Sequence, residues 1–166
     1  MRLRDRHLLL ALTWLLATCV ASLAQAGAPV RIAVIVGATA PKMALNRDAL
    51  RDIYLKKIFV DDGGHRLIPV NLPPASPLRE AFTHSLIRMP DNLLQNYWNR
   101  QYFQGVSPPY VLASQQAVVR FVASTPGAIG YIASCFVKPG VHVALWLTLP
   151  ADSPAFDDGC PAAPTH

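Results

Sequence analysis

The chain has 166 residues, and its 15 Lys and Arg against 10 Asp and Glu give a formal net charge of +5 at pH 7. Beyond residue 26 the basic residues are spread singly apart from Lys56 and Lys57, so they form no Lys/Arg stripe, and we expect no nucleic-acid partner. The sequence also lacks a Walker-type loop, a Gly-x-Ser-x-Gly motif, a Cys-x-x-Cys motif and any metal-ligand spacing of histidines. These absences argue against an enzyme and against a resident metal or cofactor.

Residues 1–26 have the three parts of a secretory signal, namely a basic head, an apolar run and the small-residue site Ala-Gln-Ala. We expect cleavage after Ala26, which would place the rest of the chain in the periplasm. Two alternatives stay open. The apolar run could be retained as a membrane anchor, although it is slightly short for one. Cys19 could instead be lipidated, although the Thr18 before it fits such a signal poorly.

The remaining chain of about 140 residues is one domain of ordinary size. We expect this domain over residues 27–150 and a C-terminal tail over residues 151–166. Two cysteines remain, Cys135 and Cys160, and in an exported protein such a pair most often forms a disulfide. The bridge would close a loop of about 25 residues, stabilise the fold by roughly 3 kcal/mol and attach the tail. Two unpaired thiols are the alternative, as is a Cys135 nucleophile acting with His142.

The predicted elements begin with a strand over residues 30–37, where a continuous apolar and β-branched run is typical of a strand covered on both faces. Asn46 can cap a helix that extends to about Lys57, and Leu45 and Leu50 are spaced as a hydrophobic staple at its start. The Asp-Asp-Gly-Gly-His segment that follows is a turn by composition.

A short strand is predicted over residues 66–72, where Pro69 has no N–H to donate to a β-ladder and therefore favours an edge position or a bulge. The next helix is predicted to begin with Ser76 as its N-cap and Pro77 at its first position. Arg79 is unexpected in this first turn, because the amide groups of a helix N-terminus prefer an anion.

Two further helices are predicted, one capped by Asp91 and ended by Gly105, the other capped by Ser114. Two strands follow, over residues 127–134 and 141–149. The alternation of strands and helices argues for the α/β class, and we expect a three-layer domain with a central mixed sheet. In the last strand, simple alternation places five apolar residues on one face: Val141, Val143, Leu145, Leu147 and Leu149.

Three segments in this order resemble one protein family. They are ALNRDALRDIYLKKIFVDDGGHRLIPVNLPPASPLREAF (residues 44–82), YWNRQYFQG (97–105) and STPGAIGYIAS (124–134). Together they resemble the small exported relatives of the phosphate-binding proteins of ABC importers, a branch of the type II periplasmic binding proteins. The resemblance implies a fold like one lobe of such a protein. It also implies a non-enzymatic solute-binding domain that is an accessory to transport or sensing, with a membrane transporter or a sensor protein as partner.

For the site, the resemblance implies a phosphate-like oxyanion held by helix N-terminal amides and hydroxyls. Ser76 would contribute a hydroxyl and Arg79 a positive charge, and Thr39, in the loop after the first strand, would add one donor. In each case a plainer role stays open. Ser76 could be only a helix cap, Arg79 could be solvated or paired with Glu80, and Thr39 could be a turn former.

The chain departs from the family at this turn. The phosphate binders carry Ser-Gly-Thr with an arginine four residues before the serine, whereas this chain has Ser76-Pro77-Leu78 preceded by Leu72. A single lobe would also leave a bound dianion partly in water. A second function is therefore a protein-interaction module that kept the fold and lost the ligand, with Tyr102 and Phe103 as contact residues. A third is a homodimer that rebuilds a two-sided cleft.

Overall fold

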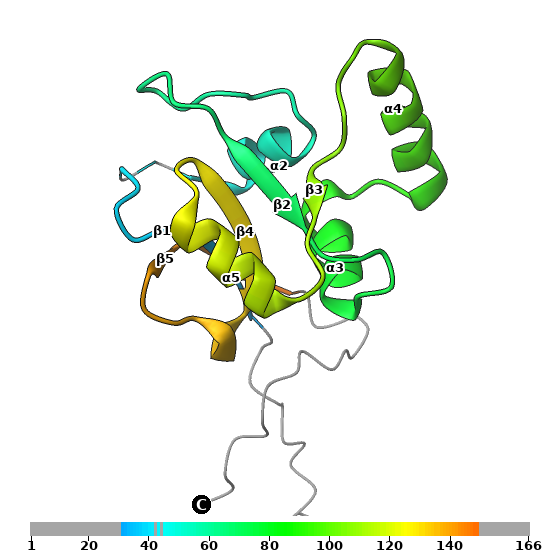
Figure 1. Cartoon of the computed structure of the whole chain (residues 1–166). Coiled ribbons are helices and arrows are strands. Elements are labelled where there is room, and N and C mark those ends of the chain that lie inside the picture. The colour runs from blue at the N-terminus through cyan, green and yellow to red at the C-terminus, as the bar shows by residue number, and fades with distance from the viewer. Residues whose placement is uncertain (1–30, 42, 44, 150–166) are drawn as a thin grey trace, which may run out of the picture.

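The computed structural model describes residues 31–41, 43 and 45–149, which form an α/β domain around one mixed sheet (Figure 1). The strand order is β3-β2-β4-β1-β5, with β2 parallel to β3 and β4, and β1 antiparallel to β4 and β5. The strands are β1 (Arg31–Gly37), β2 (Ile68–Asn71), β3 (Tyr110–Val111), β4 (Ala128–Ala133) and β5 (Val141–Thr148). The helical elements are α2 (Arg47–Tyr54), α3 (Pro77–Phe82), its π-helical continuation η1 (Thr83–Ile87), α4 (Asp91–Phe103), α5 (Gln115–Ser124) and the 3-10 turn η2 (Ser134–Phe136).

Three of the predictions fall outside the described residues: the signal peptide over 1–26, the tail over 151–166 and the position of Cys160. The Cys135–Cys160 bridge therefore stays a prediction. Within the described part of the chain, no helix is both long and apolar enough to cross a membrane.

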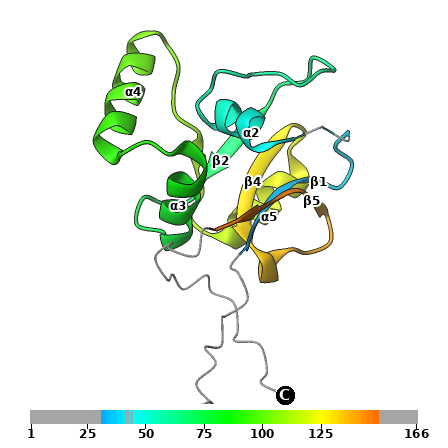
Figure 2. The same cartoon turned by 180° about the vertical axis from the view of Figure 1, so that it is seen from behind.

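Helices cover both faces of the sheet, as the view from behind shows (Figure 2). Adjacent residues of β4 identify the two sides, because successive side chains of a strand point to opposite faces. Tyr131 stacks on Phe82 of α3, with ring centroids 3.8 Å apart. A Cβ atom on the neighbouring Gly130 would meet Val118 and Val122 of α5. α3 and α5 therefore lie on opposite faces, which confirms the predicted three layers.

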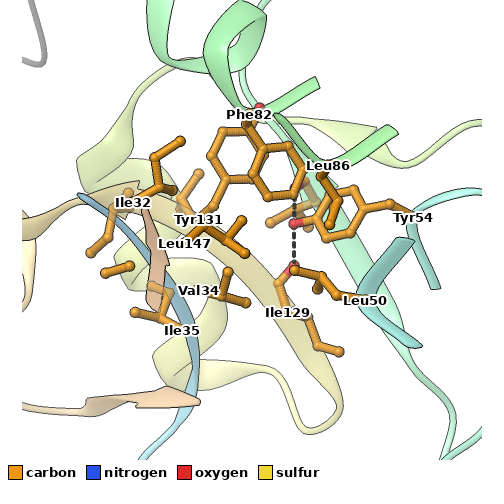
Figure 3. Close-up of a cluster of buried hydrophobic side chains, with 14 of the residues drawn as sticks. Ile32, Val34, Ile35, Leu50, Tyr54, Phe82, Leu86, Ile129, Tyr131 and Leu147 are labelled. Carbon is orange, nitrogen blue, oxygen red and sulfur yellow. Dashed lines mark hydrogen bonds between the residues drawn. The ribbon is translucent and has the colours of Figure 1, made fainter. Parts of the chain in front are cut away.

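β1 is an internal strand covered on both faces, as its sequence predicts. It lies between β4 and β5, and its residues 32–36 are all buried. Figure 3 shows Ile32 and Val34 beside Leu147 of β5 in the part of the core that faces α3. In the same cluster the Tyr54 hydroxyl donates to the carbonyl oxygen of Val70 at 3.0 Å, which joins α2 to β2.

α2 begins as predicted, because the side-chain oxygen of Asn46 accepts a backbone N–H of the first turn at 2.8 Å. It ends at Tyr54, earlier than the predicted end at about Lys57. The reason is Lys56, whose φ of 57° lies in the left-handed region and stops the helix. Lys57 lies beyond the helix and forms an ion pair with Asp52 at 3.0 Å.

Pro69 does not mark an edge strand, so that prediction is wrong. β2 lies between β3 and β4, and Pro69 pairs with Ile129 of β4. The pairing with β3 begins only at Val70, opposite Tyr110. Pro69 therefore precedes the β2–β3 ladder, where its missing N–H leaves no bond of that ladder unmade.

A bulge in β5 changes which residues face which side. Val34 pairs with Leu145, but Ile35 pairs with Val143, so Ala144 is an extra residue. Directly paired residues share a face, and consecutive residues such as Val34 and Ile35 do not. Leu145 and Val143 therefore lie on opposite faces, and the prediction of one shared apolar face for this strand is wrong.

α4 projects from the rest of the domain (Figure 1), and none of its 13 residues is buried. Its first residue is Asp91, and the cap position is Pro90, which makes no side-chain cap bond, so the predicted Asp91 cap is wrong. The one recorded side-chain bond from α4 to the body, among the described residues, is donated by the Tyr97 hydroxyl to the carbonyl oxygen of Leu55 at 2.6 Å. Gly105, with φ 78°, follows the helix end as predicted.

Candidate functional site

The strongest candidate site lies where two neighbouring parallel strands send their chains to opposite faces of the sheet. β2 ends at Asn71 and β3 at Val111, side by side in register. The chain then runs from β2 to α3 on one face, and from β3 to α5 on the other. Open α/β sheets bind ligands at such topological switch points. We call the strand ends at Asn71 and Val111, with the helix starts at Ser76 and Ser114, the switch point.

Ser76 caps α3 as predicted, and its Oγ accepts the backbone N–H of Arg79 at a long 3.4 Å. Pro77 occupies the first helical position, so one amide is absent from this turn. Ser76 is half-buried, while Pro74, Ala75 and Pro77 around it are exposed. The turn therefore reaches solvent, and the Ser76 hydroxyl keeps its own hydrogen to donate.

Arg79 has a partner that the sequence did not predict. Its Nη1 donates to the carbonyl oxygen of Leu72 at 2.7 Å, while its side chain is half-buried. The contact joins the first turn of α3 to the residue that follows β2, so it holds the intervening turn against the sheet. This accounts for a cation at a helix start. The bond uses one of the five N–H donors of the guanidinium.

A polar pair lies directly behind this turn. The Tyr131 hydroxyl donates to the side-chain oxygen of Asn71, and the backbone N–H of Leu72 lies 3.2 Å from that same oxygen. Burial raises the pKa of Tyr131 above its ordinary value. The phenol therefore stays protonated at neutral pH and serves as a fixed donor that sets the end of β2.

The second helix start is held in the same way. The Oγ of Ser114 accepts the backbone N–H of Ala117 at 3.2 Å, which confirms Ser114 as the cap of α5. The side chain of Gln115 then accepts the backbone N–H of Ala133 at 2.6 Å. The start of α5 is thereby attached to the end of β4, close to the end of β2.

Thr39 does not join this group. It follows the C-terminal end of β1, and β1 runs antiparallel to β4, which in turn is parallel to β2. The ends of β1 and β2 are therefore at opposite ends of the sheet. Thr39 instead lines a cavity of about 540 Å³, bounded also by the end of α5 and by Asp61 and His65. The structure thus brings Ser76 and Arg79 together and separates Thr39 from both.

Asn71, Tyr131 and Gln115 are site residues that the sequence analysis missed. The sequence signals were weak: Asn71 is one polar residue after an apolar run, and β3 is too short to predict. No group of three or more His, Cys, Asp or Glu residues among the described positions is arranged to hold a metal ion.

No protein-family sequence model matches the chain, and no curated protein matches it by sequence. Several solved structures match the chain by their fold. An ABC-type phosphate transport receptor from Vibrio cholerae is 21% identical, with a TM-score of 0.55 over 69% of this chain and 45% of that one. A putative phosphate ABC transporter substrate-binding protein with bound phosphate from Clostridium perfringens is 21% identical, with a TM-score of 0.57 over 70% of this chain and 44% of that one.

The domain has the fold of part of a phosphate-type substrate-binding protein. The chain spans less than half the length of either structure, which is consistent with a single lobe. The first of these proteins is a transport receptor and the second a putative substrate-binding protein. At this identity the likeness concerns the fold, and it agrees with the family resemblance of the sequence.

Proposed function

We propose that this protein is a single-lobe, non-enzymatic solute-binding domain that binds phosphate or another small oxyanion weakly at the switch point. The observation that carries the proposal is the convergence of two capped helix starts, at Ser76 and Ser114, on the ends of β2 and β3. Helix N-termini present unpaired N–H groups and a partial positive charge, which favour an anion. The bound phosphate of the Clostridium perfringens structure supports the choice of ligand.

The position of Arg79 also supports an anion. Its guanidinium contacts the main chain of Leu72, the position at which the resembled phosphate binders carry their arginine. Arg79 of α3 thus places a positive charge beside residue 72, where this chain has leucine in place of the arginine of the phosphate binders. One N–H holds the Leu72 carbonyl, and the others are available to an oxyanion together with the Ser76 hydroxyl.

We further propose that the domain is exported to the periplasm, where it serves as an accessory to a transporter or a sensor. The substrate-binding proteins that share its fold, together with the signal-like residues 1–26, support this location. Weak binding follows from size. A chain that spans less than half of those proteins offers one wall of a binding cleft, so an ion would keep part of its water shell.

Isothermal titration of the protein with phosphate and with sulfate tests this proposal. We expect weak, saturable binding that falls at least tenfold in the Ser76→Ala, Arg79→Ala double variant. Thr39→Ala is the matched control, because Thr39 lies at the other end of the sheet, and it should bind as the unaltered protein does. Circular dichroism must show that the variants are folded, since loss of the Ser76 cap costs about 1 kcal/mol. No heat with either ion would exclude the proposal.

The second candidate function is a protein-interaction module, and α4 is the observation that favours it. Tyr102 and Phe103 at its end are 70% and 89% exposed, and Leu93 on its first turn is 50% exposed. The Tyr102 and Phe103 rings also lie against each other, with centroids 6.3 Å apart, and adjacent exposed aromatic side chains on a projecting helix are typical of a contact surface. A domain that binds neither ion would leave this function as the better one.

A further inference from the structure

The two edges of the sheet differ in how they are protected. The edge strand β3 has two residues and directly follows Pro108 and Pro109. The opposite edge strand, β5, has eight residues, VHVALWLT. Proteins usually blunt a sheet edge with short strands, prolines or charged side chains, because an open edge pairs with other chains. β3 fits that rule, whereas β5 has no proline, lysine, arginine or carboxylate.

The outer side of β5 is open in the described part of the chain. β5 pairs with β1 along its whole length, from Val141 to Thr148, and no recorded backbone bond runs from it to any other segment. Alternate N–H and C=O groups of an edge strand point away from its neighbour. They form a row of donors and acceptors that have no partner among residues 31–41, 43 and 45–149.

The side chains of β5 are also incompletely covered. Leu147 is fully buried, but Val143, Ala144 and Leu145 are half-buried and Trp146 is 41% exposed. Because the bulge places Val143 and Leu145 on opposite faces, apolar surface is left open on both sides of the edge. Another strand beside β5 would cover both.

We propose that β5 pairs antiparallel with β5 of a second copy of this chain, which joins the two five-stranded sheets into one. When the same strand of two copies pairs antiparallel, both sides of the contact are supplied by one sequence. The pair then has the closed two-fold symmetry of most dimers. Charge favours the same contact. Copies that both carry a net positive charge repel each other, and the only ionisable residue that β5 brings to the contact is His142. The nearby Arg31 guanidinium comes from β1 and lies over the Trp146 ring, 5.0 Å from the ring centroid.

The segment that follows β5 along the chain is a poor occupant of this edge. Residues 150–166 contain four prolines, at positions 150, 154, 161 and 164. Proline cannot donate to a β-ladder, so a strand from this segment would leave bonds unmade. The β5 edge also lies across the sheet from β3 and the switch point. The dimer therefore leaves the oxyanion site open and is not one that rebuilds a two-sided cleft.

Sedimentation of the purified protein tests the proposal together with amide hydrogen exchange at low and high protein concentration. We expect a dimer in which alternate β5 amides exchange at least tenfold more slowly than in the diluted monomer. Trp146→Lys places a charge beside the edge and should give a folded monomer. Tyr110→Lys makes the same kind of change on β3, where the tyrosine is 65% exposed, and should leave the dimer intact.

Two results would overturn the proposal. One is a protein that stays monomeric at every concentration. The other is a dimer whose β5 amides exchange as fast as those of the monomer, because the contact would then lie elsewhere. The exchange experiment uses the unaltered protein, so it decides the matter even if Trp146→Lys does not fold. Neither result depends on whether the domain binds an oxyanion.

Discussion

Phe82 and Tyr131 stack face to face, with ring centroids 3.8 Å apart and ring planes 5° from parallel. The stack joins the last residue of α3 to the middle of β4, and Tyr54 of α2 packs its edge against Phe82 at 4.7 Å. All three side chains are buried. Since Ser76 and Arg79 lie on the same short helix, this stack fixes where the candidate site lies against the sheet.

Removal of the Phe82 ring should therefore cost a large part of the stability of the domain. We expect Phe82→Ala to lower the free energy of unfolding by about 3–5 kcal/mol, as for other buried aromatic residues replaced by alanine. Phe103→Ala is the matched control, because Phe103 is 89% exposed, and its effect should stay within about 0.5 kcal/mol. Urea denaturation measures both, and equal losses would contradict the packing described here.

Arg79 should stabilise the turn after β2 even when no ion is bound. Its bond to the Leu72 carbonyl oxygen predicts that Arg79→Ala lowers the free energy of unfolding by about 1–2 kcal/mol, the low end for a charged hydrogen bond because the side chain is half-buried. Amides of residues 72–76 should also exchange faster. Arg120→Ala, on the exposed side of α5, is the control and should change neither quantity. An unaltered exchange rate in the turn would show that Arg79 does not hold it.

The sequence predicted the parts of the fold that depend on local chemistry. The caps at Asn46, Ser76 and Ser114 and the continuous apolar run of β1 were all readable, because each reflects contacts within a few residues. The bulge at Ala144 could not be predicted from the sequence, because it appears only when β5 is aligned with β1.

The same distinction applies to the site. Ser76 and Arg79 were predicted from a helix start, which is local. The partner of Arg79 and the bond between Tyr131 and Asn71, 60 residues apart, arise from how the strands meet. Thr39 was grouped with Ser76 because both follow strands. The sequence did not reveal that β1 runs opposite to β2, which puts the two residues at different ends of the sheet.

Alkaline pH should destabilise the domain through its buried tyrosines. Burial raises the pKa of Tyr131 and of Tyr54 in the folded state above the ordinary value of 10.0. Their contribution to stability is therefore fully present below about pH 10 and is lost as the pH rises further, because only the unfolded chain then releases the proton. Each such group should lower the free energy of unfolding by up to about 1.4 kcal/mol per pH unit.

Tyr131→Phe separates this effect from simple loss of a hydroxyl. At pH 7 the variant should lose about 1 kcal/mol, the value of its bond to Asn71. Between pH 10 and 11 its stability should fall less steeply than that of the unaltered protein, since one titrating group is gone. Urea denaturation across this range measures both slopes. Parallel curves would mean that Tyr131 ionises as readily in the folded chain as in the unfolded one.

The predicted bridge between Cys135 and Cys160 can be tested by mass. Alkylation of the denatured, non-reduced protein should modify neither cysteine, and reduction before alkylation should modify both. A Cys160→Ser variant should unfold at a lower urea concentration than the unaltered protein. Its free energy of unfolding should fall by roughly 3 kcal/mol, the chain-entropy value for a loop of about 25 residues. Modification of both thiols without reduction would exclude the bridge.

Gly127 and Gly64 have nearly the same backbone angle but very different surroundings. Their φ values are 77° and 79°, so alanine at either position adopts the left-handed conformation at a cost of about 1–2 kcal/mol. A Cβ on Gly64 would meet nothing within 4 Å, whereas a Cβ on Gly127 would lie 2.0 Å from the carbonyl oxygen of Arg66. That oxygen belongs to the main chain and cannot move alone, because the next residues enter β2.

Gly127→Ala should therefore prevent folding or shift β2 against β4. Gly64→Ala should stay folded, and its free energy of unfolding should fall only by the cost of placing alanine in the left-handed conformation. Thermal unfolding of the two variants compares them directly, and their shared φ makes Gly64→Ala the control for backbone strain. The same substitution also bears on the switch point. The N–H of Ile68 bonds to the carbonyl oxygen of Gly127 at 2.8 Å at the start of β2, and a displaced β2 would carry Asn71 and the turn at Ser76 with it. If both variants lose about 1–2 kcal/mol, the close approach of Gly127 to Arg66 has no energetic consequence.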